Sequence, residues 1–184
     1  FKQTCLSIDT RKSMIMDKSI KFGADLINDV SGFDYDSDSL LKLKDKNISK
    51  VLHHMQGTPN TMQNNPKYQN VLLDIYDYFE NGINKFKDKK IILDPGIGFG
   101  KNLKHNLTLI SKVSLFHSLG FPILLGTSRK RFINQISGKY DSKDRTGGTV
   151  ASVLYLMSQG VQIFRVHNVN EVKQSILVFD KILS

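Results

Sequence analysis

The feature that most constrains the fold of this chain is a regular alternation between short apolar runs and longer stretches with helical periodicity. Each short run is rich in Ile, Leu or Val and ends in a polar or glycine-containing loop, which is typical of strands buried on both faces of a parallel sheet. The predicted strands are residues 4–8, 26–29, 51–54, 90–93, 123–125 and 163–166. The predicted helices are residues 10–22, 37–45, 67–86, 102–119, 145–158 and 169–183.

This repeated strand–helix order predicts a parallel α/β fold, either a TIM (β/α)8 barrel or an open doubly wound sheet. Polar residues stand at or just beyond the carboxyl end of all six predicted strands. In a barrel those ends meet at one mouth, whereas in an open sheet only the loops at the switch point meet. The distribution of polar residues therefore favours the barrel.

The length of the chain fits only part of such a barrel. Six strand–helix units are visible rather than eight, and 184 residues fall short of the roughly 250 that are typical of the fold. No linker or low-complexity block interrupts the pattern. We therefore expect residues 1–184 to form a single partial barrel domain, with the first two units preceding Phe1.

Composition excludes several other classes of protein. The excess of 26 basic over 17 acidic residues gives a net charge of +9, but the lysines are scattered among acids, which favours a solvated surface over a nucleic-acid interface. No run of about 18 apolar residues could span a membrane, and the first residues do not resemble a signal peptide. The single cysteine, Cys5, cannot form an internal disulfide, so we expect a reducing, cytoplasmic location.

The strongest local motif is Asp94-Pro-Gly-Ile-Gly-Phe-Gly-Lys101, which follows a buried strand. The strand delivers a carboxylate at its end, and the glycines allow a tight turn and a close approach to a ligand. The glycine spacing does not match a dinucleotide fingerprint, and Asn102 stands where a Walker A loop has Ser or Thr. A turn that only joins strand to helix remains an alternative.

Two further strands run into cationic segments. Gly-Thr-Ser128-Arg-Lys130-Arg follows the fifth predicted strand, and a hydroxyl with three cations there indicates an anion or carbonyl-oxygen site rather than a solvated loop. Arg165 and His167 are two residues apart near the end of the sixth strand, so they point the same way and suit a phosphate or pyrophosphate. A surface ion pair with a buried histidine is the alternative for that pair.

The remaining polar positions are less specific when taken alone. Asp9 could cap the next helix, and Asn28 or Asp29 could form an Asx turn. The adjacent pair His53-His54 invites a zinc interpretation, but neighbouring residues on a strand face opposite sides and no further ligand lies at zinc spacing.

Taken together, these segments resemble the signature motifs of the dihydropteroate synthase family. Six motifs occur in the family's order over nearly the whole chain, and the set is far more specific than any one member. They are Ile8-Asp-Thr10, Gly23-Ala-Asp-Leu-Ile-Asn-Asp-Val-Ser-Gly32, His54-Met-Gln-Gly-Thr-Pro-Asn-Thr-Met-Gln63, Asp94-Pro-Gly-Ile-Gly-Phe-Gly-Lys101, Gly126-Thr-Ser-Arg-Lys130 and Arg165-Val-His167.

The resemblance implies a TIM barrel that binds a pterin pyrophosphate deep in its mouth and para-aminobenzoate nearer the surface. It implies catalytic roles for Asp9, Lys130, Arg165 and His167. It implies pterin binding by Asp9, Asn28, Met55, Asp94, Phe99 and Lys130. Pyrophosphate would be bound by Arg165 and His167, and para-aminobenzoate by Ser128, Phe99 and Lys130.

The implied reaction is departure of pyrophosphate from the pterin methylene, followed by attack of the arylamine to give dihydropteroate. The family also implies Mg²⁺, with an Asn ligand upstream of Phe1, a homodimer, sulfonamides as inhibitors and, in some members, an upstream fusion to a pterin pyrophosphokinase. The family's first two substrate loops would likewise lie upstream, and Asn168 stands where the family usually has Asp. The segment alone is therefore expected to bind a pterin rather than to turn over. Two alternatives are a methyltetrahydrofolate-type pterin-binding methyltransferase, which the cationic segments oppose, and a non-catalytic pterin-binding paralogue.

Overall fold

The computed structural model describes residues 3–43, 45–86, 90–138 and 140–184. The strands are β1 (Ser7–Asp9), β2 (Leu26–Asp29), β3 (Ser49–His53), β4 (Ile91–Asp94), β5 (Leu124–Leu125) and β6 (Ile163–Phe164). The helices are α1 (Ser13–Lys21), α2 (Asp38–Leu43), α3 (Val71–Ile83), α4 (Leu103–Ser111), α5 (Arg131–Ser137), α6 (Thr146–Ser158) and α7 (Val169–Leu183). Two 3-10 helices, η1 (Val113–Leu119) and η2 (Lys143–Arg145), complete the order.

The strands pair in parallel and in chain order. A four-stranded sheet β1-β2-β3-β4 and a two-stranded sheet β5-β6 are joined by a bridge between Leu93 and Ile123. Beside that bridge, the backbone N–H of Leu93 donates to the carbonyl of Pro122 at 2.8 Å. The strands thus follow one another around one curved wall, as in a (β/α) barrel, and every carboxyl end reaches the same rim.

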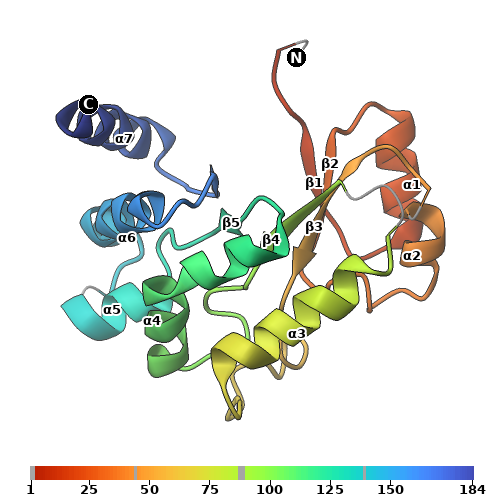
Figure 1. The fold of residues 1–184 in the computed structure, drawn as a ribbon, viewed down its shortest axis with the longest axis horizontal. Helices are drawn as coiled ribbons and strands as arrows, with labels where there is room; N and C mark the ends of the chain where they lie inside the picture. Colours follow the sequence, from red (N-terminus) through yellow and green to blue (C-terminus); the bar gives the residue numbers. More distant parts are fainter. Residues whose placement is uncertain (1–2, 44, 87–89, 139) are drawn as a thin grey trace.

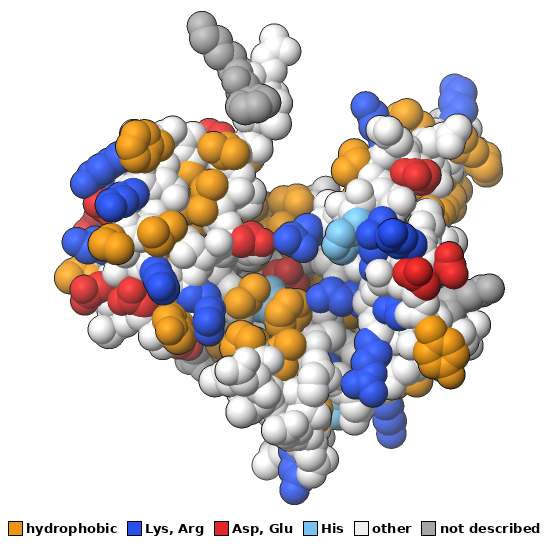
Figure 2. Space-filling model, turned by 180° about the vertical axis from the view of Figure 1, so that it is seen from behind, with side chains coloured by type: hydrophobic (Ala, Val, Ile, Leu, Met, Phe, Trp, Pro, Cys, Tyr) orange, Lys and Arg blue, Asp and Glu red, His pale blue; other side chains and the backbone are white. Residues whose placement is uncertain are grey.

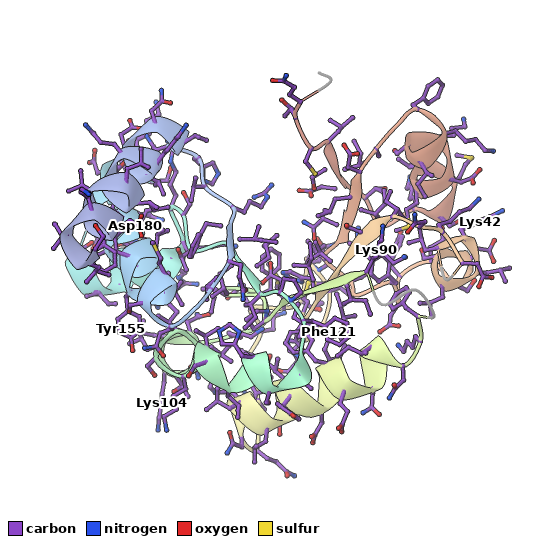
Figure 3. All side chains as sticks on the ribbon, turned by 45° about the horizontal axis from the view of Figure 1, so that its top comes forward. Lys42, Lys90, Lys104, Phe121, Tyr155 and Asp180 are labelled. Atoms are coloured by element: carbon purple, nitrogen blue, oxygen red, sulfur yellow. The ribbon has the colours of Figure 1, made fainter. Side chains whose placement is uncertain are left out.

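The wall is open rather than closed in the ribbon of Figure 1. Seen in this view, the molecule has the shape of a U with two arms. One arm contains β1, β2, α1 and α2, and the other contains α5, α6 and α7, so the two chain ends lie on different arms. Helices α3 and α4 cover the outside of the base. The side chains drawn in Figure 3 fill the base between the arms and leave the upper part of the opening empty.

The core lies between the strands and the outer helices. Helix α3 starts at the N-cap Asn70, whose side-chain oxygen accepts hydrogen bonds from two backbone N–H groups of the first turn. Its apolar residues at helical spacing, including Ile75 and Phe79, are fully buried against the sheet. Phe79 also meets Phe116 of η1 edge to face, with ring centroids 5.4 Å apart.

Most predicted elements lie within a few residues of the observed ones, and the deviations have local causes. The helix predicted over 102–119 breaks at Lys112 into α4 and a 3-10 helix, because the backbone of Lys112 leaves the helical region (φ −129°). The sequence pattern does not predict helix α5, because this helix is short and follows a cationic segment that is typical of a loop. The predicted second helix extends through residue 44, which lies outside the described residues. Within the described part of the chain, no helix has the length and apolar character needed to cross a bilayer.

We expect Phe79→Ala to lower the free energy of unfolding by about 3–5 kcal/mol, because it removes a fully buried ring and leaves a cavity. The matched control is Phe22→Ala, whose ring is 87% exposed and should change stability by less than about 0.5 kcal/mol. Urea unfolding followed by circular dichroism measures both. Equal effects of the two substitutions would contradict this packing of α3.

Candidate active site

A cavity of about 510 Å³ lies at the carboxyl ends of the strands. Figure 2, seen from behind, shows the molecule hollowed between its two arms, with acidic, basic and histidine side chains gathered beneath the notch. The cavity is lined by Asp9, Asn28, Val30, His53, Asp94, Ile97, Phe99, Gly126, Ser128, Arg129, Lys130, Ser142, Arg165 and His167.

The structure brings together eight of the nine residues singled out in the sequence. Met55 is the exception: it is half-buried beyond the end of β3 and does not line the cavity. His53, the last residue of β3, lines the cavity instead. Sequence reasoning weighed His53 only as a metal ligand and missed its place in the cavity, although its position at the end of a strand was an available signal.

The floor of the cavity carries hydrogen-bond acceptors. Asp94 is 6% exposed, and one of its oxygens, Oδ1, accepts a bond from the N–H of Gly96 at 2.8 Å. Asn28 donates from Nδ2 to Oδ1 of Asp9 at 2.9 Å, while its own Oδ1 is buried with no hydrogen-bond partner in the described structure. A buried acceptor without a partner is costly. The floor is therefore complementary to a ligand that carries N–H donors.

The alternative that Asn28 or Asp29 forms an Asx turn applies to Asp29. Asp29 Oδ1 accepts from the backbone N–H of Ser31 at 2.8 Å and from its hydroxyl at 2.5 Å. Burial raises the pKa of Asp29, against the effect of these bonds. Asp29 thus shapes the turn after β2, while Asn28 faces the cavity.

The glycine loop after β4 packs directly on the end of β3. Gly96 has φ +69°, and a Cβ built on it would lie 2.0 Å from the carbonyl oxygen of His54, so only glycine fits. Lys101 closes the loop by donating from Nζ to the carbonyl of Phe99 at 2.9 Å, with the ring nitrogen of His54 3.0 Å away. Burial lowers the pKa of Lys101 to about 7. The glycine loop is thus fixed in place as part of the site, and does more than connect β4 to α4.

Lys130 extends from the loop after β5 over the ring of Phe99, with Nζ 4.2 Å from the ring centroid. This is a cation–π contact, which is attractive and directional. Burial is the main cause that lowers the pKa of Lys130, and the charge of Asp94 opposes it. The contact therefore holds the ammonium group near the acidic floor.

The rim of the cavity is cationic. Arg165 Nη2 pairs with Asp9 Oδ2 at 3.0 Å, and this contact links the end of β6 to the end of β1. His167 Nδ1 lies 2.9 Å from the hydroxyl of Ser128, which also accepts a bond from the backbone N–H of His167 at 3.2 Å. Desolvation, followed by the charges of Arg129, Arg165 and Lys130, lowers the pKa of His167. The Ser128 contact favours the tautomer of His167 that presents Nε2–H to a ligand.

Arg129 connects the loop after β5 to the loop after β6 at this rim. It adopts φ +59° and donates from Nε and Nη2 to the side-chain oxygen of Asn168 at 3.2 and 2.8 Å. Asn168 is neutral, so this contact orients the guanidinium without cancelling its charge. The rim therefore keeps a larger positive field for an anion than an aspartate at position 168 would leave.

Strand ends of a parallel barrel, an acceptor-rich floor and a cationic rim together form the arrangement that is typical of the active site of a barrel enzyme. Among the described residues, no group of three or more His, Cys, Asp or Glu side chains could hold a metal ion.

Comparison with known proteins agrees with this class. Residues 1–167 match the family described as "Pterin binding enzyme". The dihydropteroate synthase of Escherichia coli K12 is 36% identical over 97% of the chain. The Yersinia pestis dihydropteroate synthase, solved with a sulfonamide drug complex, superposes with a TM-score of 0.93 at 34% identity, covering 98% of this chain and 67% of that one.

The dihydropteroate synthase of Thermus thermophilus has been solved in complex with 6HMPPP and with 4-aminobenzoate. The two structures give TM-scores of 0.92 and 0.91, at 33% and 34% identity. They are matched over 98% and 97% of this chain, and over 73% and 70% of their own. The chain belongs to the pterin-binding enzyme family, and its fold is that family's TIM barrel. It spans 64% of the length of the Escherichia coli relative.

We expect Gly96→Ala to destabilise the protein by about 2–5 kcal/mol, from the left-handed backbone and from overlap with the His54 carbonyl. Gly120→Ala is the control: Gly120 has φ +78°, but an added Cβ meets nothing within 4 Å, so only the backbone cost of about 1–2 kcal/mol applies. Urea unfolding of both variants gives the difference. A Gly96 variant no less stable than the Gly120 variant would show that the loop does not pack on β3 in this way.

Proposed function

We propose that this chain is the pterin-binding part of a dihydropteroate synthase of folate biosynthesis. The enzyme joins 6-hydroxymethyl-7,8-dihydropterin pyrophosphate to para-aminobenzoate, and releases pyrophosphate and 7,8-dihydropteroate. The observation that carries the proposal is the convergence of unfilled acceptors (Asn28 and Asp94) and unneutralised cations (Arg129 and Lys130) in one cavity. A pterin pyrophosphate has the complementary pattern, with N–H donors at one end and an anion at the other.

The pterin lies on the floor in this proposal. The free oxygen of Asp94 and the unpartnered Oδ1 of Asn28 accept hydrogen bonds from its amino-pyrimidine edge. Lys130 donates to the pterin carbonyl oxygen and ring nitrogen from its position over Phe99. Burial of these groups strengthens each contact, because water does not compete for it.

The pyrophosphate lies at the rim, against Arg165 and His167. In the structure Arg165 is paired with Asp9, and both side chains are about half exposed or more, at 61% and 49%. Exposed pairs of this kind contribute only about 0–1 kcal/mol, so Arg165 can leave Asp9 for a doubly ionised phosphate at little cost. That exchange frees one oxygen of Asp9 close to the reacting methylene.

The chemistry is then separation and recombination of charge. The methylene–oxygen bond breaks, pyrophosphate leaves with the electron pair, and the carboxylates of Asp9 and Asp94 stabilise the positive charge left on the pterin. The arylamine nitrogen attacks the methylene carbon, forms the new C–N bond and loses a proton to the departing pyrophosphate or to water. The protein supplies fixed charges rather than a nucleophile.

Para-aminobenzoate takes the outer part of the site, near Ser128, Phe99 and Lys130. Ser128 is hydrogen-bonded to His167, so the arylamine's carboxylate and the pyrophosphate share one polar network. Sulfonamides mimic para-aminobenzoate, and we propose that they inhibit this enzyme in the same place.

Magnesium is proposed as a companion of the pyrophosphate. The described residues do not provide a complete metal site. In phosphate chemistry, Mg²⁺ often takes most of its ligands from substrate oxygens and water. The steps of bond breaking and bond formation are carried by the protein's own charged groups.

The remaining properties are proposals from the family: a homodimer, a cytoplasmic location and, upstream, a fused pterin pyrophosphokinase. Pyrophosphate release by the full-length protein, with pterin pyrophosphate and para-aminobenzoate, tests the function. Release that depends on both substrates supports a synthase. Methyl transfer from a methylated folate without pyrophosphate release would instead identify the related methyltransferase.

We expect Asp94→Ala to weaken pterin binding at least about 100-fold, because it removes a buried, charged acceptor of N–H donors. The control is Asp180→Ala on α7, which is exposed and does not line the cavity, and should leave the affinity unchanged (Figure 3). Isothermal titration calorimetry with the pterin measures both. Wild-type affinity in the Asp94 variant would show that the floor of the cavity does not bind the pterin.

We expect Arg165→Ala to weaken pyrophosphate binding about 10- to 100-fold while pterin binding is largely kept, because the guanidinium would contact the pyrophosphate and not the pterin ring. The matched control is Arg131→Ala, since Arg131 is exposed and does not line the cavity. Separate titrations with pyrophosphate and with the unphosphorylated pterin give the two affinities. Parallel loss of both would mean that Arg165 maintains the site rather than binding the anion.

A further inference from the structure

His53 is the residue of the cavity whose chemistry the motifs do not explain. It is 2% exposed, and its ring meets the ring of Phe99 edge to face, with centroids 4.5 Å apart and planes at 86°. It lines the same floor as Asn28 and Asp94. A buried imidazole in a ligand cavity brings two nitrogens, and both need a partner.

One of these nitrogens is fixed by the backbone. Nδ1 lies 3.0 Å from the carbonyl oxygen of Val30, and a carbonyl oxygen can only accept, so Nδ1 carries the hydrogen. The other nitrogen, Nε2, is then an acceptor in the neutral ring. Burial chiefly lowers the pKa of His53, which favours this neutral form, although the charge of Asp94 opposes it.

The acceptor Nε2 faces another acceptor. Asp94 Oδ2 lies 4.0 Å away, beyond hydrogen-bond distance, and in the described structure Nε2 makes no hydrogen bond. The other charged groups that act on the ring are the ammonium groups of Lys101 and Lys130. Lys101 is engaged with Phe99 and His54, and Lys130 lies over Phe99. Nothing in the described protein therefore supplies a hydrogen to Nε2.

We propose that His53 is a specificity-determining residue that accepts a hydrogen bond at Nε2 from an N–H of the pterin's amino-pyrimidine edge, beside the bond accepted by Asp94. The inference rests on the proposed pterin site and adds a third acceptor to its floor. A donor-rich edge satisfies Nε2, Asp94 Oδ2 and Asn28 Oδ1 together. A heterocycle with acceptors at that edge leaves all three facing lone pairs, and is rejected.

Nitrogen NMR of the full-length protein labelled with ¹⁵N-histidine tests the inference directly. We expect the free protein to show His53 as the neutral Nδ1–H tautomer. We expect saturation with 6-hydroxymethylpterin to shift Nε2 upfield, as an accepted hydrogen bond does. A proton on Nε2 in the free protein, or an unmoved Nε2 in the saturated complex, would overturn the proposal.

Two variants of similar size separate the acceptor from the ring's structural role. His53→Asn keeps an N–H that can reach the Val30 carbonyl but has no atom at Nε2, so pterin affinity should fall about 10-fold. His53→Gln places an amide oxygen near the Nε2 position and should lose less than about 3-fold. Equal affinities of the two variants would contradict an acceptor role.

The outcomes also separate this inference from the function on which it rests. If the wild-type protein binds no pterin, the proposed function and this inference fall together. If the wild-type protein binds pterin, the Asp94→Ala variant does not bind it, and the NMR shift of His53 Nε2 stays unchanged, only the inference about His53 falls. If a variant does not fold, as judged by circular dichroism, the NMR measurement on the wild-type protein decides.

Discussion

The narrow backbone contact between β4 and the segment leading into β5 holds the two halves of the site together. On one side, the four-stranded sheet delivers Asn28, His53 and Asp94 to the floor of the cavity and Asp9 to its edge. On the other side, the two-stranded sheet positions the cationic residues of the rim. Among the described residues, only the Leu93–Ile123 bridge and the neighbouring Leu93–Pro122 hydrogen bond join the sheets through the backbone. Parallel pairing in chain order is therefore the constraint that turns separate motifs into one cavity.

Side chains reinforce this junction at the rim. Lys130, from the β5 side, rests on Phe99, from the β4 side, and Arg165 reaches from β6 to Asp9 on β1. Both contacts run between functional groups rather than between core residues. A ligand that engages Lys130 and Arg165 therefore acts on the same contacts that cross the opening.

The fold class and most of the site could be predicted from the sequence because both depend on short-range rules. Buried apolar runs mark parallel strands, and polar residues directly after them mark the rim. The placement of Met55 and His53 could not be predicted in this way, because it depends on tertiary detail. Met55 and His53 have the same parity along the chain, but β3 ends at His53, so alternation no longer predicts where Met55 points. Likewise, β6 ends at Phe164, so the shared direction of Arg165 and His167 follows from their contacts with Asp9 and Ser128, and not from strand geometry.

Burial divides the site into two electrostatic regions. At the floor, desolvation lowers the pKa of His53, which favours the neutral ring beside Asn28 and Asp94. At the rim the guanidinium of Arg165 is exposed to solvent and pairs with Asp9. Asp9 lies between the floor and the rim. Its Oδ1 accepts a hydrogen bond from the amide of Asn28, and its Oδ2 pairs with the guanidinium of Arg165, which an anionic ligand can displace. In the proposed reaction, this oxygen of Asp9 becomes available to the pterin cation only after the pyrophosphate has drawn Arg165 away, so binding of the anion precedes stabilisation of the cation.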